Sequence, residues 1–288
     1  MIRNVIITAF IGAALASCAN DSPEHNEALQ VECYSRSANE KKVVEDFGMY
    51  VLTSSGTAYP GVSNPVHVTY QSPGWNFSPI LLSEDAQIYS FSPYTETTDC
   101  SALNINLNNQ TDYLASAAIS ASKSNPSISI TMKHILSKIN VTIDGSSSCQ
   151  VKLLNVPNAA TYNLKNDKLT VGGSGNITTS SSSVLICPAS SQVLKMNITY
   201  NGKEYDYTAA SKTYEAGKEY GYDLTISDSK ELVINGDVTI TDWEQAGDYE
   251  GTEQKNKHEE KNFIISICLS NINRCIRAGC SKRNESNT

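Results

Sequence analysis

The sequence predicts an all-β protein of two β-sandwich domains in tandem, behind a secretory leader. Three observations carry this prediction. Short runs of alternating apolar and polar residues recur along the chain and stop at turn residues, as in β-sandwiches. Tyrosine is frequent, with 15 copies in 288 residues, and Ser, Thr and Asn fill many other positions, which suits strands with one solvated face. No long stretch keeps the 3.6-residue period of an amphipathic helix.

The chain begins with a short leader over residues 1–17. Arg3 supplies a positive start, and an apolar run through Leu15 follows. The run is shorter than the roughly 20 residues that cross a bilayer as a helix, and small residues end it, as in a secretory signal peptide. The stretch Leu15-Ala16-Ser17-Cys18 resembles a bacterial lipobox, which predicts a lipid anchor on Cys18. The alternative is an ordinary signal peptide followed by a chance cysteine.

Residues 18–39 are polar and read as a tether. Asp21, Glu24 and Glu27 follow the cysteine closely. Two interpretations stay open: a solvated linker, or a surface-export signal like those that follow the lipidated cysteine of Bacteroidetes lipoproteins.

The charge balance argues against nucleic acid as a partner. The chain carries 30 acidic and 22 basic residues, so nothing offers the broad basic surface that phosphates require. The charge is uneven, with net −11 over residues 1–251 and net +3 over residues 252–288.

The first predicted domain covers residues 40–145. Its strand candidates are Val43–Thr53, Val66–Tyr70, Ala86–Phe91, Leu103–Leu107 and Ser127–Ile143. In the last of these, the apolar residues change from even to odd positions, and a one-residue slip turns every side chain to the opposite face. The strand is therefore expected to bulge or break around His134–Lys138.

The second predicted domain covers residues 146–250, after the turn signal Asp144-Gly145. Asn201-Gly202 predicts a tight hairpin between two alternating runs. The strand candidates of this series are Val151–Val156, Leu169–Val171, Val184–Cys187, Leu194–Tyr200, Tyr205–Tyr207, Tyr220–Ile226 and Val238–Ile240.

Eight cysteines raise the question of disulfides, which form outside the cytoplasm. If Cys18 is lipidated, seven remain, and an odd number leaves one unpaired. Cys149 and Cys187 form the candidate disulfide, because both lie in the second predicted domain.

Four segments together resemble the fimbrillin family, the Mfa-like lipoproteins of Bacteroidetes. They are AQIYSFSPY (Ala86–Tyr94), ITMKHILSKINVTI (Ile130–Ile143), YEAGKEYGYDLTI (Tyr214–Ile226) and VTITDW (Val238–Trp243). Each is weak alone, but the four occur in the family's order behind a lipobox. The resemblance covers about residues 28–248.

The resemblance implies two transthyretin-like (Ig-like) β-sandwich domains and a role in type V pili. Such subunits are exported as lipoproteins. In major subunits an arginine-specific protease removes the anchor and a first strand, and a strand from a neighbouring subunit fills the groove. Arg36 is the candidate processing site here, with Ala28–Val31 as the strand removed. The alternative is a solvated arginine in a linker, and the family's anchor and tip subunits need not be cut.

The sequence predicts no enzyme, no cofactor and no metal site. The four histidines show no metal-binding spacing, and no nucleophile elbow or phosphate loop occurs. His134 reads as a surface or satisfied histidine. Trp75, after Pro73-Gly74, is the candidate binding loop for a glycan or host protein. Trp243 ends a predicted strand, and for this residue core or edge packing is favoured over a sugar-stacking role. Residues 251–288 form a basic, cysteine-containing tail that is expected to be disordered.

Two functions follow as hypotheses. The first is a fimbrial subunit or accessory tip adhesin, an outer-membrane lipoprotein exposed at the cell surface, whose partners are other subunits joined by donor-strand exchange. The second is a monomeric surface lipoprotein whose sandwich loops bind glycan or host protein.

Overall fold

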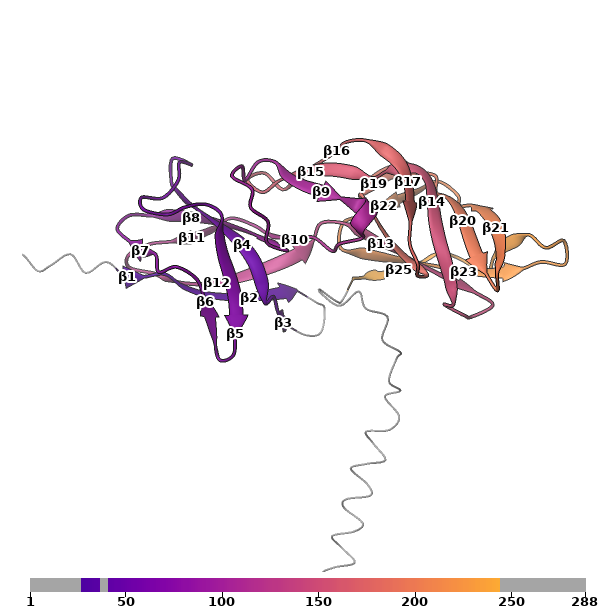
Figure 1. The fold of residues 1–288 in the computed structure, drawn as a ribbon, viewed down its shortest axis with the longest axis horizontal. Helices are drawn as coiled ribbons and strands as arrows, with labels where there is room; N and C mark the ends of the chain where they lie inside the picture. The colour runs from indigo at the N-terminus through magenta and orange to yellow at the C-terminus, as the bar shows by residue number, and fades with distance from the viewer. Residues whose placement is uncertain (1–26, 37–40, 244–288) are drawn as a thin grey trace, which may run out of the picture. The chain divides into compact units, whose positions relative to one another are not determined.

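The computed structural model describes residues 27–36 and 41–243, all of which fall in the compact unit Met1–Gly247. The predicted all-β class is confirmed. Over these residues the chain forms strands β1 to β25 and a single short 3-10 turn, η1 (Leu107–Asn109), without an α-helix (Figure 1). In this part of the chain no helix is long and apolar enough to cross a membrane.

The first group of strands forms one large curved sheet. Its order is β3-β2-β12-β10-β8-β4-β5-β6, and β11 pairs with β8. The strands are β2 (Gln30–Arg36), β3 (Lys41–Val43), β4 (Asp46–Thr53), β5 (Val66–Gln71), β6 (Gly74–Asn76), β8 (Ala86–Ser92), β10 (Leu114–Ser116), β11 (Ile119–Ala121) and β12 (Ser127–His134). A separate pair joins β1 (Glu27–Ala28) to β7 (Leu81–Leu82). Phe47, Met49, Ile88 and Ile130 are fully buried in the core of this sandwich.

The predicted break within Ser127–Ile143, where the apolar residues change from even to odd positions, is confirmed. β12 ends at His134, and β13 (Ser137–Ile143) begins after two intervening residues. β12 buries its even-numbered residues and β13 its odd-numbered ones, and Ile135 and Leu136 between them are buried as well. The strands also belong to different sheets, so the chain changes sheets here, before the turn Asp144-Gly145 at which the sequence places its domain boundary. The domain limits themselves stay a prediction.

The second group of strands forms the second sandwich. One sheet has the order β18-β13-β23-β24, with β25 also on β23, and the other has the order β17-β14-β20-β21. The strands are β14 (Cys149–Pro157), β17 (Ser174–Thr178), β18 (Ser183–Ile186), β20 (Lys195–Tyr200), β21 (Lys203–Thr208), β23 (Lys218–Ile226), β24 (Leu232–Ile234) and β25 (Thr239–Asp242), with a small pair of β19 (Ala189–Gln192) and β22 (Lys212–Tyr214). The predicted hairpin at Asn201-Gly202 joins β20 to β21, with φ of 50° and 72° at these two residues.

A segment from the first half completes the second sandwich. β9 (Leu103–Asn106) pairs with β15 (Ala159–Asn163), which pairs with β16 (Lys168–Val171). After η1, the Gln110 side chain accepts a hydrogen bond from the Leu185 N–H at 2.6 Å and donates to the Leu185 carbonyl at 3.3 Å. This amide occupies both backbone groups of Leu185 on edge strand β18, as a neighbouring strand would. The sequence predicts β9 as a strand but not its partner.

Candidate functional site

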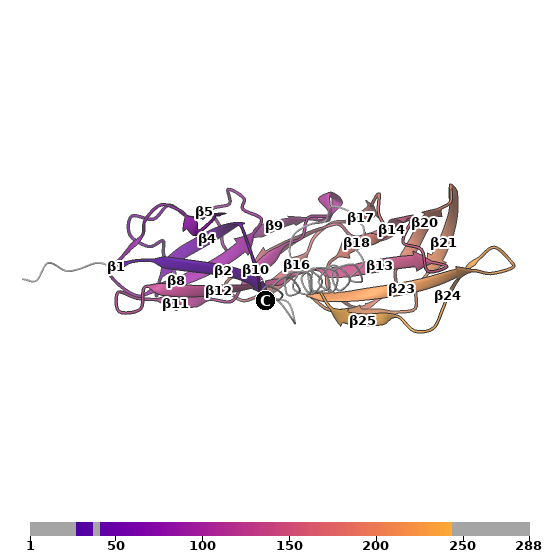
Figure 2. The same ribbon diagram turned by 90° about the horizontal axis from the view of Figure 1, so that it is seen from below.

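Strand β2 lies near the border of the first sheet. It pairs in parallel with β12 from Gln30↔Ser127 to Ser35↔Met132, and with the short β3 only from Tyr34 onward. Figure 2 shows β2 lying along β12. The Gln30 N–H also donates to the Pro126 carbonyl at 2.9 Å. Among the described strands, β12 is therefore the one neighbour of the first half of β2.

The two faces of β2 differ in chemistry. Its inner face consists of Val31, Cys33 and Ser35, and Leu29, which directly precedes the strand, continues this row; all four residues are at most 6% exposed. Gln30 and Glu32 are exposed on the opposite face. Burial raises the pKa of the Cys33 thiol far above its ordinary value, so this thiol is protonated and inert where it stands. Along this row the side chains become smaller, from Leu29 through Val31 to the small Cys33 and Ser35.

Arg36 is the last residue of β2, and its backbone is paired with that of Lys41. It is the one arginine among the residues that the structure describes. The sequence places the removable strand at Ala28–Val31, whereas the strand in the structure is Gln30–Arg36. A cut after Arg36 would therefore separate the whole of β2 from the rest of the sheet.

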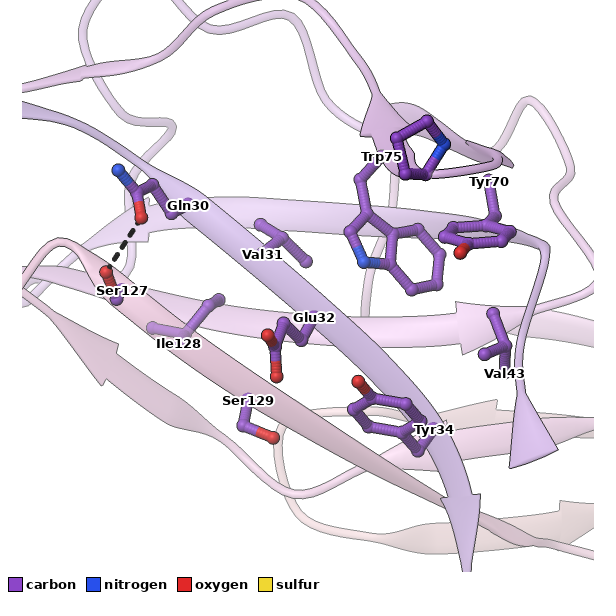
Figure 3. A pocket seen from close by; sticks show the side chains of 11 residues that line it. Gln30, Val31, Glu32, Tyr34, Val43, Tyr70, Trp75, Ser127, Ile128 and Ser129 are labelled. Carbon is purple, nitrogen blue, oxygen red and sulfur yellow. Dashed lines mark hydrogen bonds between the residues drawn. The ribbon is translucent and has the colours of Figure 1, made fainter. Parts of the chain in front are cut away.

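Trp75 lies in β6 and not in the loop that the sequence predicts. Its indole is half-buried and packs edge-on against Phe47, with ring centroids 5.6 Å apart, and against Tyr70 at 4.9 Å. It lines a groove of about 520 Å³ between the β5–β6 hairpin, β2 and the start of β12. Figure 3 shows Trp75 and Tyr70 on one side of this groove, and Glu32 and Tyr34 of β2 on the other.

Two side-chain interactions hold the polar residues of the groove in place. The Ser127 hydroxyl donates to Oε1 of Gln30 at 3.2 Å, which ties the outer faces of β12 and β2 together (Figure 3). The negative charge of Glu32 and a hydrogen bond to its carboxylate raise the pKa of Tyr34. The groove thus combines aromatic rings with a carboxylate, an amide and hydroxyl groups.

The predicted disulfide between Cys149 and Cys187 is not formed, and both are free, buried thiols. The Cys149 Sγ lies 3.6 Å from the carbonyl oxygen of Val141, whereas Cys187 follows Ile186, which pairs with Ser137. Val141 lies four positions beyond Ser137 along strand β13, which is about 13 Å at 3.3 Å per residue. A disulfide needs Cα atoms within about 7 Å, so the two strands hold these thiols too far apart.

His134 is buried, and the sequence misses its setting. Its Nδ1 lies 2.9 Å from Oδ1 of Asp112, and its ring stacks on Trp243 with centroids 3.8 Å apart at 8°. Its Nε2 is buried without a hydrogen-bond partner among the described residues. Lys138 places its Nζ 5.6 Å from the Trp243 ring centroid. Trp243, the residue directly after β25 (Thr239–Asp242), is therefore a packing residue, as the sequence favours.

The remaining sequence candidates lie elsewhere. Cys18 and the tail 251–288 fall outside the described residues. Within the described ranges, no three His, Cys, Asp or Glu side chains are grouped to hold a metal ion. The groove and the adjoining strand β2 form the candidate functional site.

The chain is similar to fimbrillin-like proteins in sequence and to proteins described as cell adhesion proteins in fold. The family model for fimbrillin-like proteins matches residues 36–243. A proposed cell adhesion protein from Bacteroides uniformis has the same fold, with a TM-score of 0.59 at 21% identity over 75% of this chain and 99% of that chain. Another, from Bacteroides ovatus, gives a TM-score of 0.58 at 13% identity over 77% of this chain and 99% of that chain. No curated protein matches the chain.

Proposed function

This chain belongs to the fimbrillin-like family, and on that premise we propose that it is a subunit of a surface fimbria that joins its neighbours by strand exchange. A protease cuts after Arg36, β2 leaves its sheet, and a strand of a neighbouring subunit takes its place. The chain acts as a structural and adhesive protein and not as an enzyme.

One observation carries this proposal: β2 is a complete strand near the sheet border that ends at the single arginine of the described chain. Its removal leaves β12 with unpaired backbone N–H and C=O groups along one edge, which is the template that an added strand needs. The same removal uncovers the hydrophobic core beneath Val31 and Cys33.

The inner face of β2 specifies what the replacing strand must present. Leu29 and Val31 are buried, and each contributes about 1.5–3 kcal/mol by leaving water. Cys33 and Ser35 are buried as well, and both are small. A donor strand parallel to β12 should therefore carry two apolar residues and then two small residues at alternate positions.

The same proposal places the subunit at the outer membrane before assembly. Lipidation of Cys18 would hold the precursor there, since this residue precedes the first described strand in the sequence. A cut after Arg36 would release the folded part from this anchor together with β2.

A second function has one observation in its favour, the aromatic groove beside Trp75. An uncut, monomeric lipoprotein would keep β2 in place and use this groove to bind a glycan or host protein at the cell surface.

The deciding experiment treats the chain from Ala19 to Thr288 briefly with an arginine-specific protease and runs it unboiled on a denaturing gel. Strand exchange predicts a ladder of stable multimers, with the cut after Arg36 identified by mass spectrometry. The matched control is Arg36→Lys, which keeps the positive charge, resists this protease and leaves every other arginine of the chain unchanged. A ladder that persists in the control, or a cut without a ladder, would refute assembly through β2.

A further inference from the structure

The groove beside Trp75 presents aromatic surface from three different strands. Tyr34 comes from β2, Tyr70 from β5 and Trp75 from β6, and all three rings are half-buried. The Trp75 ring is inclined by 59° to Tyr70 and by 72° to Phe47, which contacts it from the core. Because the indole contacts both of these rings, its position in the groove is fixed before any ligand arrives. Such rings offer flat apolar surface beside polar tips.

The polar groups of the groove narrow the class of ligand. Glu32 supplies a carboxylate that accepts hydrogen bonds, and Ser129 supplies a hydroxyl that can donate and accept. Among the described residues that line the groove none is basic, so an anionic ligand would find no counter-charge there. Flat apolar rings beside acceptors and hydroxyls match the two surfaces of a pyranose, which has an apolar C–H face and a rim of hydroxyl groups.

The size of the groove agrees with this chemistry. Its volume of about 520 Å³ lies within the range of about 300–1,000 Å³ that ligand pockets occupy. A mono- or disaccharide fits this space, and a longer chain would extend along β2 into solvent.

We propose that this groove binds a short neutral saccharide, and that it does so only while β2 is in its sheet. The second statement follows from the lining, because Gln30, Glu32 and Tyr34 all belong to β2. It rests on the proposed function, in which β2 leaves. Saccharide binding and strand release then compete, and the ligand holds the subunit in its unassembled form.

The strength of this competition follows from mass action. A ligand that binds one state of a protein stabilises that state by a factor of 1 + [L]/Kd. At ten times its Kd, a saccharide should therefore reduce the population of cut subunit that has released β2 by about 11-fold.

The first test measures binding on the uncut chain from Ala19 to Thr288. Trp243→Phe leaves Trp75 as the one fluorophore of its kind, since the chain has two tryptophans. Maltotriose, cellotriose and chitotriose are titrated to about 10 mM, above the millimolar Kd of weak ligands. A saturable change with one of them supports the site. Tyr34→Ala and Glu32→Gln should each weaken it by about tenfold, and Thr131→Ala, exposed on β12 outside the groove, should not.

Two outcomes would overturn the site: no probe alters the Trp75 signal, or binding survives both groove substitutions unchanged. If Trp243→Phe does not fold, saturation-transfer NMR on the unsubstituted chain reports the same binding and decides between the same outcomes.

The second test measures the competition. After the cut at Arg36, alkylation of Cys33 reports release of β2, because this thiol is fully buried in the sheet. The saccharide that binds should slow alkylation by about 11-fold at ten times its Kd, and an unchanged rate would overturn the competition while leaving the binding site intact. If β2 is never released, the proposed function fails, and the fluorescence titration alone decides the saccharide site.

Discussion

Val31→Ala should speed the release of β2 from the cut subunit. Val31 is 6% exposed on the inner face of the strand. The substitution removes two carbon groups at about 0.8 kcal/mol each, and the space left behind brings the loss to about 2 kcal/mol. Since about 1.4 kcal/mol changes an equilibrium tenfold, the released population should rise by about 30-fold.

The assay uses the buried thiol two residues further along the same strand. The chain is cut with an arginine-specific protease and exposed to an alkylating reagent, and mass spectrometry follows the label on the peptide that carries Cys33. Before the cut, this thiol is 0% exposed and should stay unlabelled.

The control is Glu32→Gln, between these two residues on the exposed face. It keeps the size of the side chain and changes no inner-face residue, so without saccharide its effect on labelling should be below about twofold. Equal labelling rates for Val31→Ala and the unsubstituted chain would show that the inner face of β2 does not hold it in the sheet, and the reasoning would fail.

Three further outcomes follow from the fold. Gln110→Ala should lower the free energy of unfolding by about 2–5 kcal/mol, because the backbone N–H and C=O of buried Leu185 both lose their hydrogen-bond partner. Gln110→Glu keeps the acceptor and should lower the free energy of unfolding by less. Urea unfolding of the two variants measures the difference. Burial raises the pKa of Cys149 to about 11 from an ordinary value of 9.0. The protonated thiol therefore contributes its full stability below pH 9, and this contribution is lost as pH rises through 11. The midpoint of thermal unfolding should fall between pH 8 and 11, and it should fall less steeply in Cys149→Ala. Gly48→Ala should cost about 1–3 kcal/mol, because its new Cβ would lie 2.3 Å from a ring carbon of Phe91, and Phe91→Leu should recover part of that loss in a double-mutant comparison.

The sequence allows local features of this fold to be predicted, because each has a local cause. The break after His134 can be predicted because alternation fixes the face of every side chain. Apolar residues at even positions and apolar residues at odd positions cannot face the same core from one regular strand. The hairpin at Asn201-Gly202 is readable because its residues accept the left-handed backbone that a tight hairpin requires. Neither feature depends on which strand lies beside it.

The sequence falls short wherever distant residues decide the outcome. The strand before Arg36 appears short because its inner face continues from Val31 into Cys33 and Ser35, which do not read as apolar. Its partner begins at Ser127, 97 residues away from Gln30. The same distance hides the role of Gln110, whose amide reaches Leu185 across 75 residues. The groove is hidden too, since β2, β6 and β12 must meet before its walls exist.

Because its side chains alternate between two faces, β2 has two separate roles. Residues on its inner face, such as Cys33, meet the core and determine how firmly the strand is held. Residues on its outer face, such as Glu32 and Tyr34, line the groove and determine what is bound. Because successive side chains of a strand point to opposite faces, a substitution on one face leaves the other largely intact. Changes at Cys33 and Ser35, which do not line the groove, should therefore alter strand release at constant saccharide affinity, whereas Val31→Ala can alter both because Val31 also lines the groove. Outer-face changes should alter affinity and affect release only when saccharide is present.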